Sequence, residues 1–339
     1  MGLTYGGSGV DVAALERSRR AIGRAISSTH GLGPARTVDG FGHYAGLVSL
    51  PGGRMLATHT DGVGTKVLVA RMMEKYDTVG IDCIAMNVND VICVGAEPVS
   101  FVDYIAASRN EPRIFASIAR GLARGARQAC VPIVGGETAV MPGLMGGRGF
   151  SFDLAGTVAG IVGRGRLVTG SGIREGDVIT GAASSGLHSN GYSLARRALL
   201  RRYSVRDRVR GVGTIGGALL RPTRIYAGPV LEIAKRCRVS GLAHITGGSF
   251  AKLGRLKAMM YEIDHLPRIP PIMGLIEGQG VARREMYSTF NMGVGFCVIA
   301  PPSESGTIAE IFKRHGVASQ EVGRVRRGRG VSVMSERIA

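Results

Sequence analysis

The sequence lacks the features that define several protein classes. The 339 residues include no tryptophan, and the five cysteines form no CxxC pair, so neither a zinc site nor a disulfide framework is predicted. No apolar run reaches the roughly 20 residues that a bilayer span needs, and the N-terminal residues resemble no signal peptide. We therefore expect a cytoplasmic protein with no membrane partner.

Lysine is also scarce, although the chain is strongly basic. Only six of the 43 basic residues are lysines, and the formal net charge is +18. Basic chains often bind nucleic acid, and the densest arginine run is 196–210. That run holds one aromatic residue, Tyr203, which is too few for stacking bases, and the other arginines are spread along the chain. The composition thus favours a small phosphate-bearing substrate and no nucleic-acid partner. RNA binding through 196–210 and 324–329 is the alternative, and it predicts strongly salt-dependent retention of RNA.

The standard nucleotide-binding and hydrolase motifs are missing as well. There is no GxxxxGK[ST] segment and no GxSxG segment, which excludes a P-loop and a nucleophile elbow. The single GxGxxG match, Gly211–Gly216, follows a polar arginine-rich stretch rather than a strand. We interpret it as a loop.

Apolar runs alternate with helical patterns throughout, which predicts a mixed α+β fold. A glycine- and charge-rich break at Gly163–Gly176 divides the chain into two domains, residues 1–165 and 166–339. In the first domain we expect helices over 11–29 and 111–130, and strands over 55–60, 99–106, 131–134 and 152–162. In the second we expect strands over 177–182 and 293–300, helices over 192–202, 222–236 and 303–315, and two short terminal strands.

Three segments that combine acids with glycines carry the chemistry of the first domain. The first is Thr60–Lys66 (TDGVGTK), directly after a predicted strand. Asp61 there could hold Mg²⁺, Gly62 and Gly64 let the backbone approach phosphates, and Lys66 supplies a positive charge. A tight turn with a solvated Asp and Lys is the structural alternative.

The second segment, Gly80–Pro98, places Asp82, Asn87, Asn89 and Asp90 in an otherwise apolar stretch. If the segment is a helix, these polar groups must be paired or coordinate something, because leaving them unmet costs about 1–3 kcal/mol each. Capping and structural hydrogen bonds are the alternative to ligand binding.

The third segment ends a predicted strand in a Gly-Gly turn, with Gly136 followed by Glu137. Three acids, Asp61, Asp90 and Glu137, each lie beside glycines or amides. This is the set that a Mg²⁺–nucleotide site without a P-loop requires.

The second domain contributes Ser184–Ser193 (SSGLHSNGYS), in which His188 and Asn190 precede a predicted helix. A helix N-terminus attracts anions, and a histidine there can bind phosphate or transfer a proton. A surface or capping histidine is the alternative. A further Gly-Gly turn follows Thr246 at Gly247 and Gly248.

Together these segments resemble the phosphoribosylformylglycinamidine cyclo-ligase family, the AIR synthetases. The matching stretches are TDGVGTK from Thr60, DTVGIDCIAMNVNDVICVGAEP from Asp77, VGGETAVMPG from Val134, SSGLHSNGYSL from Ser184, PTRIY from Pro222, AHITGG from Ala243 and EMYSTFNMGVG from Glu285. The element from Asp90 to Pro98 is shared with a wider ATP-using superfamily that includes selenophosphate synthetase and thiamine-monophosphate kinase. A small-molecule kinase or synthetase of that superfamily is therefore the runner-up.

The resemblance implies two α/β-type domains whose N-terminal sheets pair across a homodimer into a β-barrel. It also implies the reaction: formylglycinamidine ribonucleotide and ATP give aminoimidazole ribonucleotide, ADP and phosphate, through phosphorylation of the formyl oxygen and attack of the amidine nitrogen on that carbon.

Matched motif by motif, the resemblance also implies the site residues, with His188, Asp61 and Lys66 as the catalytic ones. ATP and Mg²⁺ are expected at Asp61, Gly62, Gly64, Thr65, Lys66, Asp82, Asn87, Asn89, Asp90, Gly136 and Glu137, with the metal itself at Asp61, Asp90 and Glu137. The ribonucleotide is expected at His188, Asn190, Thr246, Gly247 and Gly248.

Two stretches depart from the family pattern. Tyr5 is followed by Gly6, where the family has a lysine, and Thr37–Tyr44 (TVDGFGHY) keeps only the Gly-Phe-Gly centre of a glycine-rich segment.

Overall fold

The computed structural model describes residues 3–4, 6–9, 12–38, 43–146 and 149–339. The helices are α1 Val12–Ser27, α2 Lys66–Met73, α3 Val79–Val91, α4 Pro112–Ala129, α5 Tyr192–Leu199, α6 Ile215–Leu219, α7 Ala227–Arg236, α8 Pro271–Glu277, α9 Arg283–Thr289 and α10 Ser305–Arg314. The strands are β1 Thr37–Val38, β2 Gly46–Leu50, β3 Arg54–Gly62, β4 Glu97–Ala107, β5 Ile133–Val140, β6 Phe152–Gly163, β7 Val178–Ala183, β8 Arg208–Val209, β9 Gly213–Thr214, β10 Gly241–His244, β11 Met260–Ile263, β12 Val294–Ala300, β13 Ser319–Arg326, β14 Gly330–Val333 and β15 Glu336–Arg337.

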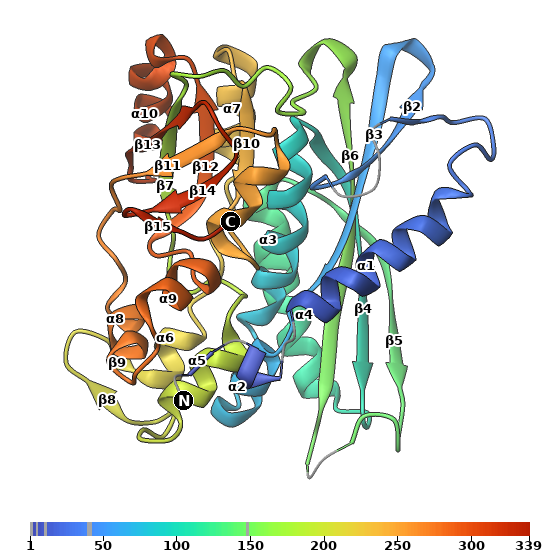
Figure 1. The fold of residues 1–339 in the computed structure, drawn as a ribbon. Coiled ribbons are helices and arrows are strands. Elements are labelled where there is room, and N and C mark those ends of the chain that lie inside the picture. Colours follow the sequence, from blue (N-terminus) through green and yellow to red (C-terminus); the bar gives the residue numbers. More distant parts are fainter. Residues whose placement is uncertain (1–2, 5, 10–11, 39–42, 147–148) are drawn as a thin grey trace.

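The first sheet has the strand order β1-β2-β3-β6-β4-β5, and β4 and β5 are its parallel pair. Along β6, Phe152, Leu154 and Val158 are buried while Asp153 and Thr157 are exposed, which is the period-two pattern of a sheet covered on one face. Helices α3 and α4 lie on the covered side (Figure 1).

Glycines allow α3 and α4 to pack against each other closely. A Cβ on Gly80 of α3 would lie 2.3 Å from the backbone nitrogen of Leu122, and one on Gly121 of α4 would lie 2.3 Å from the carbonyl oxygen of Asp77. Any side chain at either position would force the helices apart.

The second sheet has the strand order β10-β12-β7-β13-β11-β14-β15. Helix α3 lies between the two sheets in Figure 1, and every one of its residues is buried. A helix buried on all sides must satisfy its polar groups internally. The partners of the polar groups of α3 therefore decide which of these groups are available to bind a ligand.

Most expected elements are confirmed, with four differences. The strand expected over 131–134 is β5, which continues through Gly135, Gly136 and Glu137 to Val140, so the Gly-Gly turn expected at its end is wrong. The helix expected over 222–236 is α7, which begins only at Ala227. The helix expected over 11–29 is α1, but Ile22 and Ile26 on its apolar face are 54% and 39% exposed. The GxGxxG segment forms the turn of the short β8–β9 hairpin and the start of α6, with Gly211 at φ 79° and Gly213 at φ 90°.

Some expectations concern parts of the chain that the structure leaves undescribed. Asp11, the first residue of the helix expected over 11–29, lies outside the described residues, as do Tyr5 and the Gly-Phe-Gly centre at 40–42. Across the described ranges, none of the helices has the length and apolar character needed to traverse a bilayer.

Candidate active site

Asp61 lies near the end of β3, on the face of the first sheet that α3 covers. Its Oδ1 accepts a hydrogen bond from the backbone nitrogen of Gly62 at 2.8 Å. Burial and the negative charge of Asp90 raise the pKa of Asp61, and His59 only partly opposes them. A cation beside Asp61 would relieve this repulsion.

Asp90, on α3, is the most heavily bonded acid of the site. His244 Nδ1 lies 2.7 Å from its Oδ1, while His59 Nε2 lies 3.3 Å and Lys252 Nζ 3.9 Å from its Oδ2. Burial acts to raise the pKa of Asp90, but the charge of Lys252 and the hydrogen bond from His244 outweigh it and hold the pKa far below its usual range. Asp90 is therefore ionised and anchored.

Asn87 holds His59 in place beside the acids. Its Nδ2 donates to the carbonyl oxygens of Asp61, at 3.1 Å, and Cys83, at 2.9 Å, which fixes the amide so that Oδ1 faces His59 Nδ1 at 3.3 Å. Both ring nitrogens of His59 thus meet oxygen acceptors, on Asn87 and on Asp90.

Asn89, two residues further along α3, does the same for His244. The backbone nitrogen of Tyr226 donates to Asn89 Oδ1 at 2.9 Å, and Asn89 Nδ2 donates to the carbonyl oxygen of Arg224 at 2.8 Å. Asn89 Nδ2 also lies 3.3 Å from His244 Nε2, so that nitrogen accepts and the hydrogen of His244 is on Nδ1, facing Asp90. These bonds tie the second domain to α3.

Lys66 and Asp82 form a fully buried ion pair away from this cluster. Lys66 Nζ lies 2.8 Å from both oxygens of Asp82 and also donates to the carbonyl oxygens of His188 and Arg221, at 3.2 and 2.8 Å. Asp82 Oδ1 accepts from the backbone nitrogen and hydroxyl of Thr223 as well. No donor of Lys66 is left for a phosphate in this arrangement, and the pair instead joins α2 and α3 to the second domain.

Glu137 lies on the opposite face of the first sheet from Asp61. Asp61 is in one register row with Gly156, Asp103 and Gly136, whereas Glu137 is in the next row, with Tyr104. Successive strand residues point to opposite faces, and three steps between strands separate β3 from β5 by roughly 14 Å. Glu137 is exposed, and its Oε1 accepts from the backbone nitrogen of Thr138. The structure thus brings Asp61 and Asp90 together and leaves Glu137 apart.

His188 and Asn190 come together in the second domain, and both have unsatisfied donors. His188 is 1% exposed with φ 63°, and its Nε2 accepts from the backbone nitrogen of Ser185 at 3.2 Å. His188 Nδ1 and Asn190 Nδ2 are buried with no hydrogen-bond partner in the described part of the chain. Burial lowers the pKa of His188, so the ring is neutral and its remaining hydrogen is on Nδ1.

The turn after β10 reaches the same region. A Cβ on Gly247 would lie 2.8 Å from Asn190 Oδ1, and Gly248 has φ 82°, a conformation that favours glycine. Thr246 is buried, and its hydroxyl accepts from Lys252 Nζ. Of the predicted ribonucleotide residues, Asn190 therefore meets the turn of Thr246, Gly247 and Gly248, and His188 is two residues before Asn190.

Sequence reasoning missed three residues of the site: His59, His244 and Lys252. His59 and His244 each lie two residues before a residue that was singled out, Asp61 and Thr246, and that proximity was the available signal. Nothing in the sequence distinguishes Lys252 from a surface lysine.

Two carboxylates here suit Mg²⁺. In the described residues no group of three or more His, Cys, Asp or Glu side chains is arranged to hold a metal. Asp61 and Asp90 still fit one, because hard oxygen ligands with mutually repelling charges bind a divalent cation that also takes phosphate oxygens and water.

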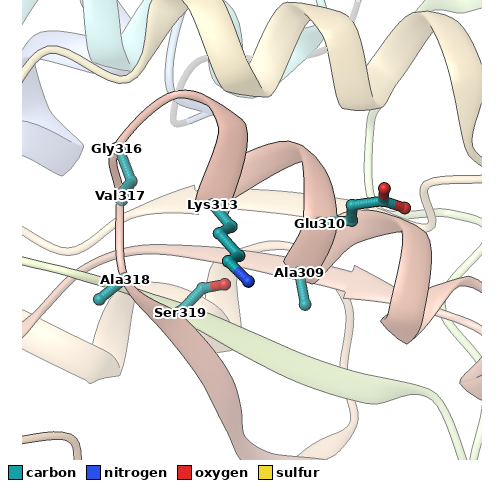
Figure 2. A pocket seen from close by; sticks show the side chains of 7 residues that line it. All are labelled: Ala309, Glu310, Lys313, Gly316, Val317, Ala318 and Ser319. Carbon is teal, nitrogen blue, oxygen red and sulfur yellow. The ribbon is translucent and has the colours of Figure 1, made fainter.

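A surface pocket of about 550 Å³ lies elsewhere, between the end of α10 and the start of β13 (Figure 2). Lys313 and Ser319 point into it and Glu310 points away. None of the acids or histidines described above lines it, so it is separate from the candidate site.

Two family models match the chain. AIR synthase related protein, N-terminal domain, matches residues 42–162, and AIR synthase related protein, C-terminal domain, matches residues 174–336. The phosphoribosylformylglycinamidine cyclo-ligase of Thermococcus kodakarensis is 46% identical over 329 residues, 95% of each chain. That of Methanocaldococcus jannaschii is 45% identical over 330 residues, 95% of this chain and 92% of the relative.

Solved structures share the fold at low sequence identity. Thiamine-monophosphate kinase from Stenotrophomonas maltophilia superposes with a TM-score of 0.63 at 18% identity, covering 95% of this chain and 96% of that one. PurL of Thermotoga maritima, solved in complex with FGAR, gives a TM-score of 0.62 at 21% identity, covering 89% of this chain and 47% of PurL.

Proposed function

The chain belongs to the family of phosphoribosylformylglycinamidine cyclo-ligases, and on that premise we propose how its residues divide the reaction. It is an ATP-dependent ligase of purine biosynthesis that converts formylglycinamidine ribonucleotide to aminoimidazole ribonucleotide, releasing ADP and phosphate. The observation that carries this conclusion is the identity of about 45% to such enzymes over nearly the full length. The enzyme is expected to work in the cytoplasm.

The ATP phosphates are assigned to the end of β3 and the turn after it, within a domain of residues 1–165. Asp61 and Asp90 would hold Mg²⁺, which when bound neutralises phosphate charge. Gly64 supports this assignment because its φ of 67° and the open space around it let the backbone approach a phosphate. Gly62 and Thr65 line the same turn, and Asn87 and Asn89 orient the histidines that flank Asp90.

The ribonucleotide is assigned to the second domain, residues 166–339. The unsatisfied Nδ1 of His188 and Nδ2 of Asn190 support this assignment, since a bound substrate would supply the acceptors they lack. Thr246, Gly247 and Gly248 lie beside them. Lys66 and Asp82 act indirectly, because their ion pair holds the loop of His188 against α2 and α3.

The direct test is phosphate release from Mg²⁺–ATP with and without formylglycinamidine ribonucleotide, while the aminoimidazole product is followed by its diazo colour. Equal amounts of product and phosphate, both strictly dependent on the ribonucleotide, are expected. Phosphate release without the ribonucleotide, or transfer of the phosphoryl group to another acceptor, would instead favour a small-molecule kinase of the same superfamily.

A homodimer formed through the uncovered face of the first sheet is also part of the proposal. On this face Val102 is 38% and Tyr104 43% exposed, and all of β5 except Ala139 is exposed. Exposed apolar groups side by side on a sheet indicate a partner surface. Pairing two such faces would form the barrel and would place Glu137 at the interface, where it could serve the neighbouring subunit's site.

Tyr104→Glu should therefore convert a dimer to monomers at micromolar concentration, because it buries a charge in the proposed interface. Light scattering coupled to size exclusion measures the mass. Met334→Glu, at a similarly exposed methionine of the second domain, is the matched control and should leave the mass unchanged. A monomeric wild type, or a dimer in the Tyr104 variant, would contradict the proposal.

A further inference from the structure

The chemistry assigned above needs a positive charge at the transferring phosphoryl group, and Lys66 does not supply it. All three hydrogens of Lys66 Nζ are directed at Asp82 and at two backbone carbonyls, and the side chain is fully buried. Besides the Mg²⁺ assigned to Asp61 and Asp90, phosphoryl-transfer sites commonly place a fixed cationic side chain at the phosphoryl group, and here a residue other than Lys66 must provide it.

Lys252, in the 3-10 helix Ser249–Arg255 after β10, is positioned for this. Its Nζ lies 3.9 Å from Asp90 Oδ2, and its positive charge also acts on Asp61. The side chain is 11% exposed and passes over the ring of Tyr44, with Nζ 5.3 Å from the ring centroid. Tyr44 and Asp90 thus hold the ammonium in a fixed place.

The hydrogen bonds of Lys252 separate it from Lys66. Its Nζ donates to the hydroxyl of Thr246, and the 3.9 Å to Asp90 is too long for a hydrogen bond. Within the described residues, two of its three hydrogens therefore have no acceptor. A buried ammonium with spare donors is arranged to receive one, and phosphate oxygens are suitable acceptors.

The position of Lys252 between the two groups of site residues specifies the ligand. Thr246 belongs to the group assigned to the ribonucleotide, and Asp90 to the group assigned to ATP. Lys252 contacts Thr246 and faces Asp90, so its ammonium lies between the residues assigned to the ribonucleotide and those assigned to ATP.

We propose that Lys252 is a catalytic residue that binds the phosphoryl group during its transfer, an assignment that rests on the proposed function. In this step the formyl oxygen forms a bond to the γ-phosphorus, and the bond from that phosphorus to the bridging oxygen of ADP breaks. The ribose-bearing nitrogen then attacks the activated carbon and loses its proton, and the carbon–oxygen bond breaks to release phosphate. Lys252 stabilises the charge on the phosphoryl oxygens in the first step.

Lys252→Met tests the proposal. Its kcat should fall on the order of 100-fold or more, because one fixed charge contact to the transition state is removed. KM for the ribonucleotide should change by less than about threefold, since Thr246 and the His188 loop remain. Lys252→Arg, which keeps the charge, should recover part of kcat.

Lys235→Met is the matched control, because Lys235 is a lysine of the second domain paired with Glu97 at the surface. It should match wild type. If the Met variant fails to fold, Lys252→Gln keeps a donor for Thr246 without the charge and makes the same test. Wild-type kcat in the Met or Gln variant, or a loss in the Arg variant as large as in the Met variant, would overturn the proposal. The wild-type enzyme in the same assay tests the cyclo-ligase activity separately.

Discussion

Asp61→Asn should reduce turnover on the order of 100-fold or more while the protein becomes no less stable. The variant keeps an oxygen to accept from the backbone nitrogen of Gly62, so the local turn is preserved. It loses the charge that would bind the metal and phosphates. Because burial and Asp90 raise the pKa of Asp61, removing that charge also removes a repulsion from the folded state.

The sign of the pH dependence follows from the raised pKa. The folded protein binds the Asp61 proton more tightly than the unfolded chain does, so ionisation of Asp61 costs stability as pH rises through the folded pKa. The stability difference in favour of the Asn variant should therefore be largest at neutral pH. It should vanish below the ordinary aspartate pKa of about 4.

Urea unfolding at several pH values, together with the phosphate-release assay, measures both effects. Asp207→Asn is the control, because Asp207 is exposed, lies in the second domain away from both the site and the proposed interface, and its Oδ2 likewise accepts from a backbone nitrogen, that of Ser204. It should change neither activity nor the pH profile. An Asp61 variant that turns over normally, or that unfolds much more easily than wild type, would show that Asp61 serves the fold instead.

The sequence identified the right helix but not the partners of its polar residues. The argument that buried oxygens in Gly80–Pro98 must be paired or coordinate something is confirmed, because Asp82, Asn87 and Asn89 are all paired within the protein. Those partners, Lys66, His59 and Tyr226, come from distant parts of the chain. Spacing along one helix shows which faces are polar, but tertiary contacts decide what meets them.

Glu137 shows a second limit of predicting the site from the sequence. The sequence places Asp61 and Glu137 at glycine-rich strand ends, but the face to which a strand residue points depends on register, and a shift of one residue reverses it. Here the register puts Asp61 in the row of Asp103 and Glu137 in the row of Tyr104. Lys252 shows a related limit, since its role in the site depends on its distance from Asp90, which is a tertiary contact.

Lys66→Met should produce the largest loss of stability, about 3–5 kcal/mol of unfolding free energy. The substitution leaves Asp82 buried without its cation, and the carbonyl oxygens of His188 and Arg221 lose their donor. Burial lowers the pKa of Lys66, and its pairing with Asp82 only partly opposes this. The cost of the substitution arises from the charge that it leaves unpaired on Asp82.

Urea denaturation of the single variants and of Lys66→Met/Asp82→Asn separates these contributions. The double variant should recover part of the loss, because no buried charge then remains, and the coupling energy should exceed about 1 kcal/mol. Lys75→Met, which breaks the exposed pair of Lys75 with Asp77, is the matched control and should cost about 0–1 kcal/mol. A Lys66 variant that has normal stability but uses ATP much less well would show that Lys66 binds the phosphates. A destabilised variant whose folded fraction turns over normally would show that Lys66 serves only to join the two domains. Lys252 would then be the lysine that faces Asp61 and Asp90 in catalysis.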